Sequence, residues 1–166
     1  VERAKACLDN GADKICLNAA ARNRPALISD CARVFGSQAV VVAVDVTTSG
    51  PAPALYDYRA GTADLSVDWL DWIEQVERLG AGEIRLMDVS REGRRPGYNT
   101  DLLTQARGRT RLPVILEGGA GKLDDLDAAM AGGADALALG TMLVFSDNNI
   151  IQVKRFLKNA GHPIRL

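Results

Sequence analysis

Two hydrophobic periods alternate along the chain and predict strands and helices in turn. Short, almost continuous apolar runs are typical of parallel strands that are buried on both faces. They lie at residues 14–18, 39–45, 83–88, 113–117 and 136–139. The segments between them place apolar residues three or four positions apart, as amphipathic helices do. These predicted helices cover residues 1–10, 25–35, 67–79, 99–109, 123–131 and 149–160.

A glycine-containing joint recurs where a predicted helix gives way to the next strand. Its copies are residues 10–13, 79–83 and 132–135. Glycine readily takes the left-handed conformation that commonly ends a helix. Three copies of one joint indicate a repeated unit. The chain therefore reads as one helix followed by five strand–helix units, which predicts an α/β fold with a parallel sheet.

Two architectures fit this order of elements, an open doubly wound sheet and a (β/α)8 TIM barrel. A doubly wound dinucleotide fold is expected to carry Gly-x-Gly-x-x-Gly after its first strand. Here the first predicted strand is followed by Asn18 and three alanines, without glycine. The glycine run at residues 118–121 follows the fourth predicted strand instead. Barrels commonly build phosphate sites in the loops after their last two strands, so we favour the barrel.

Composition narrows the class of protein. The 166 residues include 20 Lys and Arg against 21 Asp and Glu, and 47% are hydrophobic. This composition is typical of a globular domain. The net charge of −1 gives no long-range electric field that would attract nucleic acid or anionic lipid. No apolar run reaches the roughly 18 residues of a membrane span, and no signal peptide opens the chain. We therefore expect a cytoplasmic protein without nucleic-acid or membrane partners.

The cysteines carry little chemistry in this reading. Cys7, Cys16 and Cys31 are odd in number and lack Cys-x-x-Cys spacing. They indicate buried free thiols in a reducing compartment and not a disulfide framework or a zinc site. We expect no metal and no cofactor.

Candidate functional residues follow the predicted strands, since loops at the carboxyl ends of parallel strands line the functional site. Asp45 ends a run of five apolar residues and is a candidate acid or base, with capping of the next turn as the alternative. Gly118 and Gly119, with Gly140 and Thr141 one unit later, offer backbone N–H groups to an anion. Further polar residues at these ends are Asn18, Thr47, Thr48, Asp88, Ser90, Glu92 and Glu117.

Two long loops are also candidates. Loop 88–99 contains Arg94 and Arg95, which can bind a phosphate through paired N–H groups. For residues 49–64 we predict a hairpin-like segment that lies over the mouth of the barrel, either as a lid or as a spacer.

Several motifs occur together and in order. They are residues 11–18, 35–38, 40–45, 80–84, Gly93 with Gly97 and Tyr98, and 118–121. Together they resemble the cyclase subunit of imidazole glycerol phosphate synthase, of histidine biosynthesis, over essentially the whole chain. The family is a (β/α)8 barrel of roughly 250 residues. Aligned with this family, residues 1–166 form a single partial barrel domain that contains strand–helix units four to eight of the barrel. Because its two outer strands would lack a partner, we expect these residues alone to self-associate.

The resemblance implies a reaction and a partner. The cyclase takes the phosphoribulosyl aminoimidazole carboxamide nucleotide and ammonia from a glutaminase subunit. It releases imidazole glycerol phosphate and the aminoimidazole carboxamide ribotide.

The resemblance also implies roles for particular residues. Asp45 matches one of two catalytic carboxylates, and the other belongs to a first strand outside these residues. Asn18 matches a residue near one substrate phosphate. At the opposite strand ends Asp13, Lys14 and Glu83 match the gate through which ammonia enters, with a salt bridge closing the barrel bottom as the structural alternative. The residues that match the second phosphate site are Gly93, Gly118, Gly119, Gly140 and Thr141, with Arg94 beside them.

Some positions depart from the family pattern. The usual Asp-Arg-Asp-Gly-Thr reads Ser-Arg-Glu-Gly-Arg at residues 90–94, Glu117 replaces a small hydroxyl residue, and Asp88 replaces a neutral one. A carboxylate beside a phosphate is repelled unless a cation such as Arg94 or Arg95 compensates. Two alternatives therefore stay open. One is a related subunit that supplies ammonia to a sugar of surface polysaccharide synthesis, and the other is a barrel that only activates a glutaminase.

Overall fold

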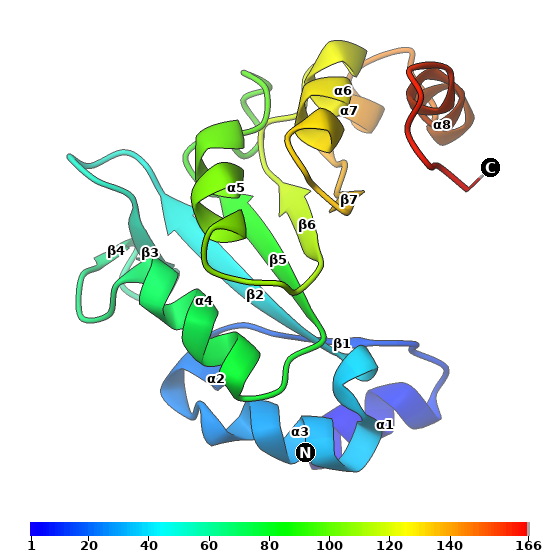
Figure 1. Ribbon diagram of the computed structural model, residues 1–166. Helices are drawn as coiled ribbons and strands as arrows, with labels where there is room; N and C mark the ends of the chain where they lie inside the picture. Colours follow the sequence, from blue (N-terminus) through cyan, green and yellow to red (C-terminus); the bar gives the residue numbers. More distant parts are fainter. Residues whose placement is uncertain (166) are drawn as a thin grey trace.

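A sheet of five parallel strands runs through the protein (Figure 1). The structure is a computed structural model that describes residues 1–165. The strands are β1 (Ile15–Leu17), β2 (Val40–Thr47), β5 (Glu83–Asp88), β6 (Val114–Glu117) and β7 (Ala136–Leu137), and they lie side by side in this order. The predicted α/β fold with a parallel sheet is confirmed.

Helices connect the strands. They are α1 (Glu2–Asp9), α2 (Ala19–Asn23), α3 (Ala26–Phe35), α4 (Trp69–Arg78), α5 (Thr100–Arg107), α6 (Leu123–Ala131), α7 (Thr141–Val144) and α8 (Ile150–Asn159), with a 3-10 turn η1 at Ser37–Ala39. All predicted strands and helices are present, with ends within two residues of those expected. The sequence reading missed α2, α7 and η1, because each is too short to display a helical period.

A hairpin interrupts the regular alternation between β2 and α4, as predicted. It consists of β3 (Ala54–Asp57) and β4 (Thr62–Asp64), and β3 pairs antiparallel with the last residues of β2. This pairing is possible because β1 reaches only as far as Val42 along the same edge of β2. Arg22 of α2 fixes the hairpin, since it donates to the Tyr56 carbonyl at 3.1 Å and forms an ion pair with Asp64.

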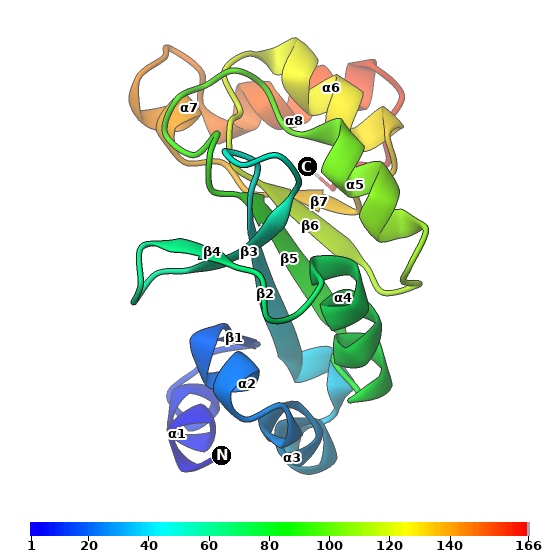
Figure 2. The same cartoon turned by 90° about the vertical axis from the view of Figure 1, so that its left-hand side faces the viewer.

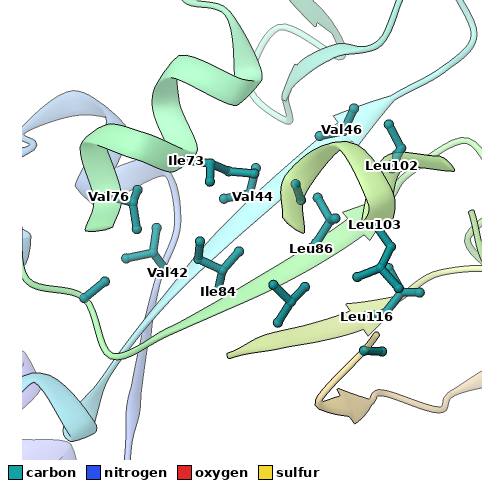
Figure 3. Close-up of a cluster of buried hydrophobic side chains, with 14 of the residues drawn as sticks. Val42, Val44, Val46, Ile73, Val76, Ile84, Leu86, Leu102, Leu103 and Leu116 are labelled. Carbon is teal, nitrogen blue, oxygen red and sulfur yellow. The ribbon is translucent and has the colours of Figure 1, made fainter. Parts of the chain in front are cut away.

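The two faces of the sheet differ in chemistry. On one face, alternate residues of the strands pack against α4 and α5 (Figure 3). The side chains in this part of the core are Val42, Val44, Val46, Ile84, Leu86 and Leu116 of the strands, with Ile73, Val76, Leu102 and Leu103 of the helices. The opposite face carries Asp45, Arg85 and Glu117, and we call it the polar face.

The expectation that the strands are buried on both faces holds for only part of the sheet. All eight residues of β2 are buried. In β6 and in the first four residues of β5, buried residues alternate with half-buried ones, which include Arg85, Ile115 and Glu117. The polar face is therefore partly open to solvent at these residues, whereas Met87 of β5 is buried.

The repeated joint is a single hydrogen-bonded motif. Gly11, Gly80 and Gly133 have φ angles of 97°, 92° and 97°. In each case the next N–H donates to a carbonyl five residues back, as in a Schellman motif. Gly161, with φ 96°, forms a fourth copy at the end of α8. The prediction of a repeated unit is confirmed.

The sheet does not close on itself within residues 1–165. Of the described strands, β1 pairs only with β2, and β7 pairs only with β6. Near β7, the end of α7 and the start of α8 leave apolar side chains exposed, most of all Val144, Phe145 and Ile151. No helix among the described residues is both long and apolar enough to cross a membrane.

Residues 1–166 expressed alone should self-associate, because unpaired strand edges and exposed apolar side chains favour contacts between copies. Sedimentation velocity should detect oligomers or the protein should be insoluble. Replacing Phe145→Glu and Ile151→Glu together should weaken the association. Leu65→Glu, at an exposed position beside the hairpin, is the matched control and should leave it unchanged. A monomer at all accessible concentrations would contradict this expectation.

Candidate functional site

The carboxyl ends of the strands bring the candidate residues to one edge of the sheet. In Figure 1 the arrowheads of β2, β5 and β6 all point toward the top of the picture, where the loops gather. Figure 2 shows the same loops from the side, with the β3–β4 hairpin beside them. Asp45, Asp88 and Glu117 lie at or near the ends of these three strands.

Asp45 is the most buried charged group on the polar face, with 3% of its surface exposed. Its Oδ2 accepts a hydrogen bond of 2.6 Å from the Asn18 side chain, which follows β1. Its Oδ1 lies 3.4 Å from an Arg85 guanidinium nitrogen. The structure thus brings together the two predicted residues Asn18 and Asp45 and gives each carboxylate oxygen one donor.

Arg85 joins two carboxylates, and sequence reasoning missed it. Its side chain forms ion pairs with Asp45 and with Glu117, the latter at 3.1 Å from Nε to Oε2. These two buried atoms approach without hydrogen-bond geometry. A charged residue in the middle of the apolar run 83–88 was a visible signal, because a charge there needs a partner inside the fold.

Glu117 faces both a cation and other acids. Burial raises the pKa of its carboxyl, Glu92 and Asp45 raise it further, and Arg85 opposes them. The sequence suggested that Arg94 or Arg95 would balance this charge. The ion pair forms with Arg85 instead, because β5 lies next to β6 in the sheet and Arg85 is on the same face.

The glycine run after β6 has a packing role that is independent of any ligand. A Cβ atom on Gly118 would lie 2.6 Å from the Asp88 carbonyl oxygen, and one on Gly119 would lie 2.3 Å from the Gly97 carbonyl oxygen. A Cβ on Gly121 would lie 2.4 Å from the Arg95 carbonyl oxygen. The Gly97 N–H also donates to Gly119 at 2.8 Å. Loop 88–99 therefore packs directly on the glycine run.

A small pocket lies where these loops meet, and it gathers most of the predicted phosphate residues. Arg94 is not among its lining residues and instead lines a neighbouring depression with Lys122. Arg95 is thus the arginine beside the pocket. The residues that line the pocket are Glu92, Gly93, Arg95, Glu117, Gly118, Gly119, Ala120, Ala138, Leu139, Gly140 and Thr141.

Asp88 organises the loop that packs on the glycine run. It is 1% exposed and accepts hydrogen bonds from Asn99 Nδ2 at 2.7 Å, the Ser90 N–H at 2.9 Å and Thr48 Oγ1 at 3.0 Å. Arg91 Nε lies 3.5 Å from Oδ2. With all these donors around it, the Asp88 carboxylate ties the loops after β2 and β5 together, and its role is structural.

The hairpin borders the Asp45 side of the site. Tyr58 stacks edge-to-face on Tyr56, with ring centroids 4.9 Å apart. Burial, and then the negative charge of Asp45, raise the pKa of Tyr58 to about 12. A cleft beneath the hairpin is lined by Asn18, Arg22 and Trp72 among others. Asn18 therefore belongs both to the Asp45 site and to the mouth of this cleft.

The opposite strand ends carry a separate charged pair. Lys14, just before β1, forms an ion pair with Glu83, the first residue of β5. Asp13 is exposed in the preceding loop. This ion pair agrees with the salt bridge that the sequence suggested for the lower edge of the sheet. Among residues 1–165, no group of three or more His, Cys, Asp or Glu side chains has the arrangement of a metal site.

The expectation that the three cysteines are buried is wrong for two of them. Cys31 is buried, whereas Cys7 and Cys16 are exposed.

The fold and this site define a class of protein, an α/β enzyme-like domain with a buried carboxylate and a glycine-lined pocket at the carboxyl ends of parallel strands. The family model described as histidine biosynthesis protein matches residues 1–149. The chain belongs to this family.

Named relatives agree with the family assignment. The chain is 43% identical over 169 residues to imidazole glycerol phosphate synthase subunit HisF of Metallosphaera sedula. It is 40% identical over 167 residues to the subunit of that name from Chlorobium phaeobacteroides and 38% identical over 165 residues to that of a Thermotoga species. The matches cover 99%, 100% and 99% of this chain, but only 66%, 66% and 65% of the relatives.

Removing the Asp88 carboxylate should destabilise the full-length protein. Asp88→Ala leaves three donors without their acceptor, and we expect a loss of about 2–4 kcal/mol in the free energy of unfolding. Urea denaturation followed by circular dichroism measures it. Asp147→Ala, at an exposed carboxylate, is the control and should change the value by less than about 0.5 kcal/mol. An equal effect of the two substitutions would refute the structural role of Asp88.

Proposed function

We propose that the full-length protein containing these residues is the cyclase subunit of imidazole glycerol phosphate synthase in histidine biosynthesis. It converts the phosphoribulosyl aminoimidazole carboxamide nucleotide, with ammonia, to imidazole glycerol phosphate and the aminoimidazole carboxamide ribotide. The observation that carries this proposal is the buried Asp45–Asn18 pair, which shares one edge of the sheet with the glycine-lined pocket. The names of the relatives support it.

The proposed architecture is a (β/α)8 barrel of which residues 1–166 form a single partial domain with units four to eight. Three observations support it. Helices cover the apolar face of the sheet, the strands follow one another in sequence order, and the outer strands β1 and β7 each have a free edge among the described residues. In such a barrel the polar face would line the interior, and the loops described above would form the active-site mouth.

Each side of the proposed site has its own task. Ammonia addition and ring closure require proton transfers, and Asp45 is the acid or base that supplies them. Asn18 orients the Asp45 carboxylate and contacts one end of the substrate. The other phosphate lies against backbone N–H groups of the second phosphate site. The residues proposed for that site are Gly93, Gly118, Gly119, Gly140 and Thr141, with Arg95 beside the pocket and Arg94 next to it.

The proposed partner is a glutaminase that docks at the opposite strand ends. The ion pair between Lys14 and Glu83 lies there, with Asp13 next to it, and these residues form the proposed gate for ammonia. The substrate enters at one edge of the sheet and ammonia at the other. The names of the relatives do not favour the polysaccharide subunit or the non-catalytic barrel.

The proposal predicts ammonia-dependent turnover. The full-length protein, given the nucleotide and an ammonium salt, should form imidazole glycerol phosphate without a glutaminase. Asp45→Asn should lower kcat at least about 100-fold, because it removes the proton-transfer group while keeping the hydrogen bond to Asn18 feasible. Asp101→Asn on the exposed side of α5 is the matched control and should turn over like the wild type. Product formation can be followed by chromatography. No turnover in any preparation would contradict the proposal.

Glu117 should limit phosphate binding. At neutral pH its charge repels a phosphate in the pocket, so Glu117→Ser should lower the Kd for imidazole glycerol phosphate at least about fivefold, equivalent to about 1 kcal/mol. Because the pKa of Glu117 is raised, its charge disappears as the pH falls through that pKa, and the wild type should approach the variant there. Calorimetry at several pH values measures the Kd of the wild type and of the variant, and how each changes with pH. Equal or weaker binding by the variant at neutral pH would refute this role.

A further inference from the structure

The position of Arg85 on β5 explains how one side chain reaches two strands. In the sheet, Arg85 is the partner of Ala43 on β2 and of Ile115 on β6. Asp45 and Glu117 each lie two residues further along those strands, so both are diagonal neighbours on the same face. The small Ala43 side chain leaves the guanidinium free to lean toward the strand ends.

The Arg85 guanidinium pairs with the carboxylates on both sides of the site, Asp45 and Glu117. It lies 3.4 Å from Asp45 Oδ1 and 3.1 Å from Glu117 Oε2. An arginine is charged at every accessible pH and is planar, so it can hold two carboxylates in a fixed relation. Asp45 has its second donor in Asn18, whereas Glu117 Oε2 is buried and has no hydrogen-bond donor among the described residues.

Glu117 links this ion-pair group to the pocket. Glu117 lines the pocket together with Glu92, and burial and the charge of Glu92 both act against the ionised form of its carboxyl group. Arg85 itself does not line the pocket. The charged residues that line the pocket are two acids, Glu92 and Glu117, and one arginine, Arg95, so Arg85 offsets one of the acids from outside the pocket. The affinity of the pocket for an anion therefore depends on how completely Arg85 balances the charge of Glu117.

We propose that Arg85 is a positioning residue for both halves of the site: it holds the Asp45 carboxylate in place and offsets the charge of Glu117, so that the glycine-lined pocket accepts a phosphate. This inference rests on the proposed function for the identity of the reaction. The part of the inference that concerns phosphate binding involves only an anion and the pocket. It can therefore be tested without measuring the reaction.

The first test measures inorganic phosphate binding by calorimetry on the full-length protein. Arg85→Met, which keeps an unbranched chain similar to the aliphatic part of arginine but removes the charged guanidinium, should weaken binding about five- to tenfold. Adding Glu117→Gln to Arg85→Met should restore wild-type affinity, since the charge to be balanced is then gone. Arg33→Met, at an exposed arginine on α3, is the control and should bind phosphate like the wild type.

The second test measures the cyclase reaction with an ammonium salt. Arg85→Met should lower kcat about 10- to 100-fold, because Asp45 loses one of its two holding contacts. The Arg85→Met, Glu117→Gln double variant should recover KM but not kcat. Arg85→Lys should recover only part of kcat, because a single ammonium group cannot hold both carboxylates. A merely structural role would lower the amount of folded protein and leave both constants of the folded fraction unchanged.

The two tests distinguish a failure of the inference about Arg85 from a failure of the proposed function. Unchanged phosphate affinity in Arg85→Met would overturn the inference even if the cyclase reaction proceeds. No phosphate binding by the wild type would overturn it together with the proposed phosphate site. Phosphate binding that depends on Arg85, in a protein without cyclase activity, would support the part of the inference that concerns phosphate binding and contradict the proposed function.

Discussion

The charge balance on the polar face is the constraint on which the rest of the site depends. Three ionisable side chains, Asp45, Arg85 and Glu117, meet there from three adjacent strands. A buried carboxylate is stable only when it is paired or hydrogen-bonded. Pairing both carboxylates with one guanidinium fixes their separation and joins the Asn18 side of the site to the glycine-lined pocket. The strand register sets this geometry, so the backbone determines the site as much as the side chains do.

Close backbone packing is the second constraint. The glycine run after β6 and loop 88–99 approach so closely that side chains at Gly118, Gly119 and Gly121 would collide with carbonyl oxygens. Gly118 and Gly119 also line the pocket. Asp88 holds loop 88–99 in the shape that this packing requires. Packing alone therefore requires all three glycines of this run, and it is compatible with anion binding at the two that line the pocket.

Much of the fold was predictable because it depends on local patterns. Strand β5 and helix α6 were predicted with both ends correct, since each apolar period ends abruptly at a charge or at glycine. The Schellman joints were visible as repeated glycines. Helices α2 and α7 were missed because five and four residues cannot display a period. The sequence reading expected part of a barrel with unpaired outer strands, and the described residues form an open sheet whose outer strands β1 and β7 each have one pairing partner.

The candidate site was less predictable because it depends on contacts between strands. Strand-end position was enough to select Asp45 and Asn18, which do meet. The partner of Glu117 was expected in loop 88–99, and it is Arg85, which only the register between β5 and β6 brings close. Of the two arginines that the sequence offered to a phosphate, Arg95 lines the pocket, whereas Arg94 lines the neighbouring depression. Charges on neighbouring strands can be paired only when the order and the register of those strands are known.

A crystal structure of the full-length protein with the nucleotide substrate bound would test the proposed site. We expect one phosphate at Gly118, Gly119, Gly140 and Thr141 and the other end of the substrate near Asn18. Asp45 should lie within hydrogen-bond distance of the reacting atoms between them. A substrate bound away from Asp45, or a pocket at the glycine run that holds no phosphate, would contradict the proposed site.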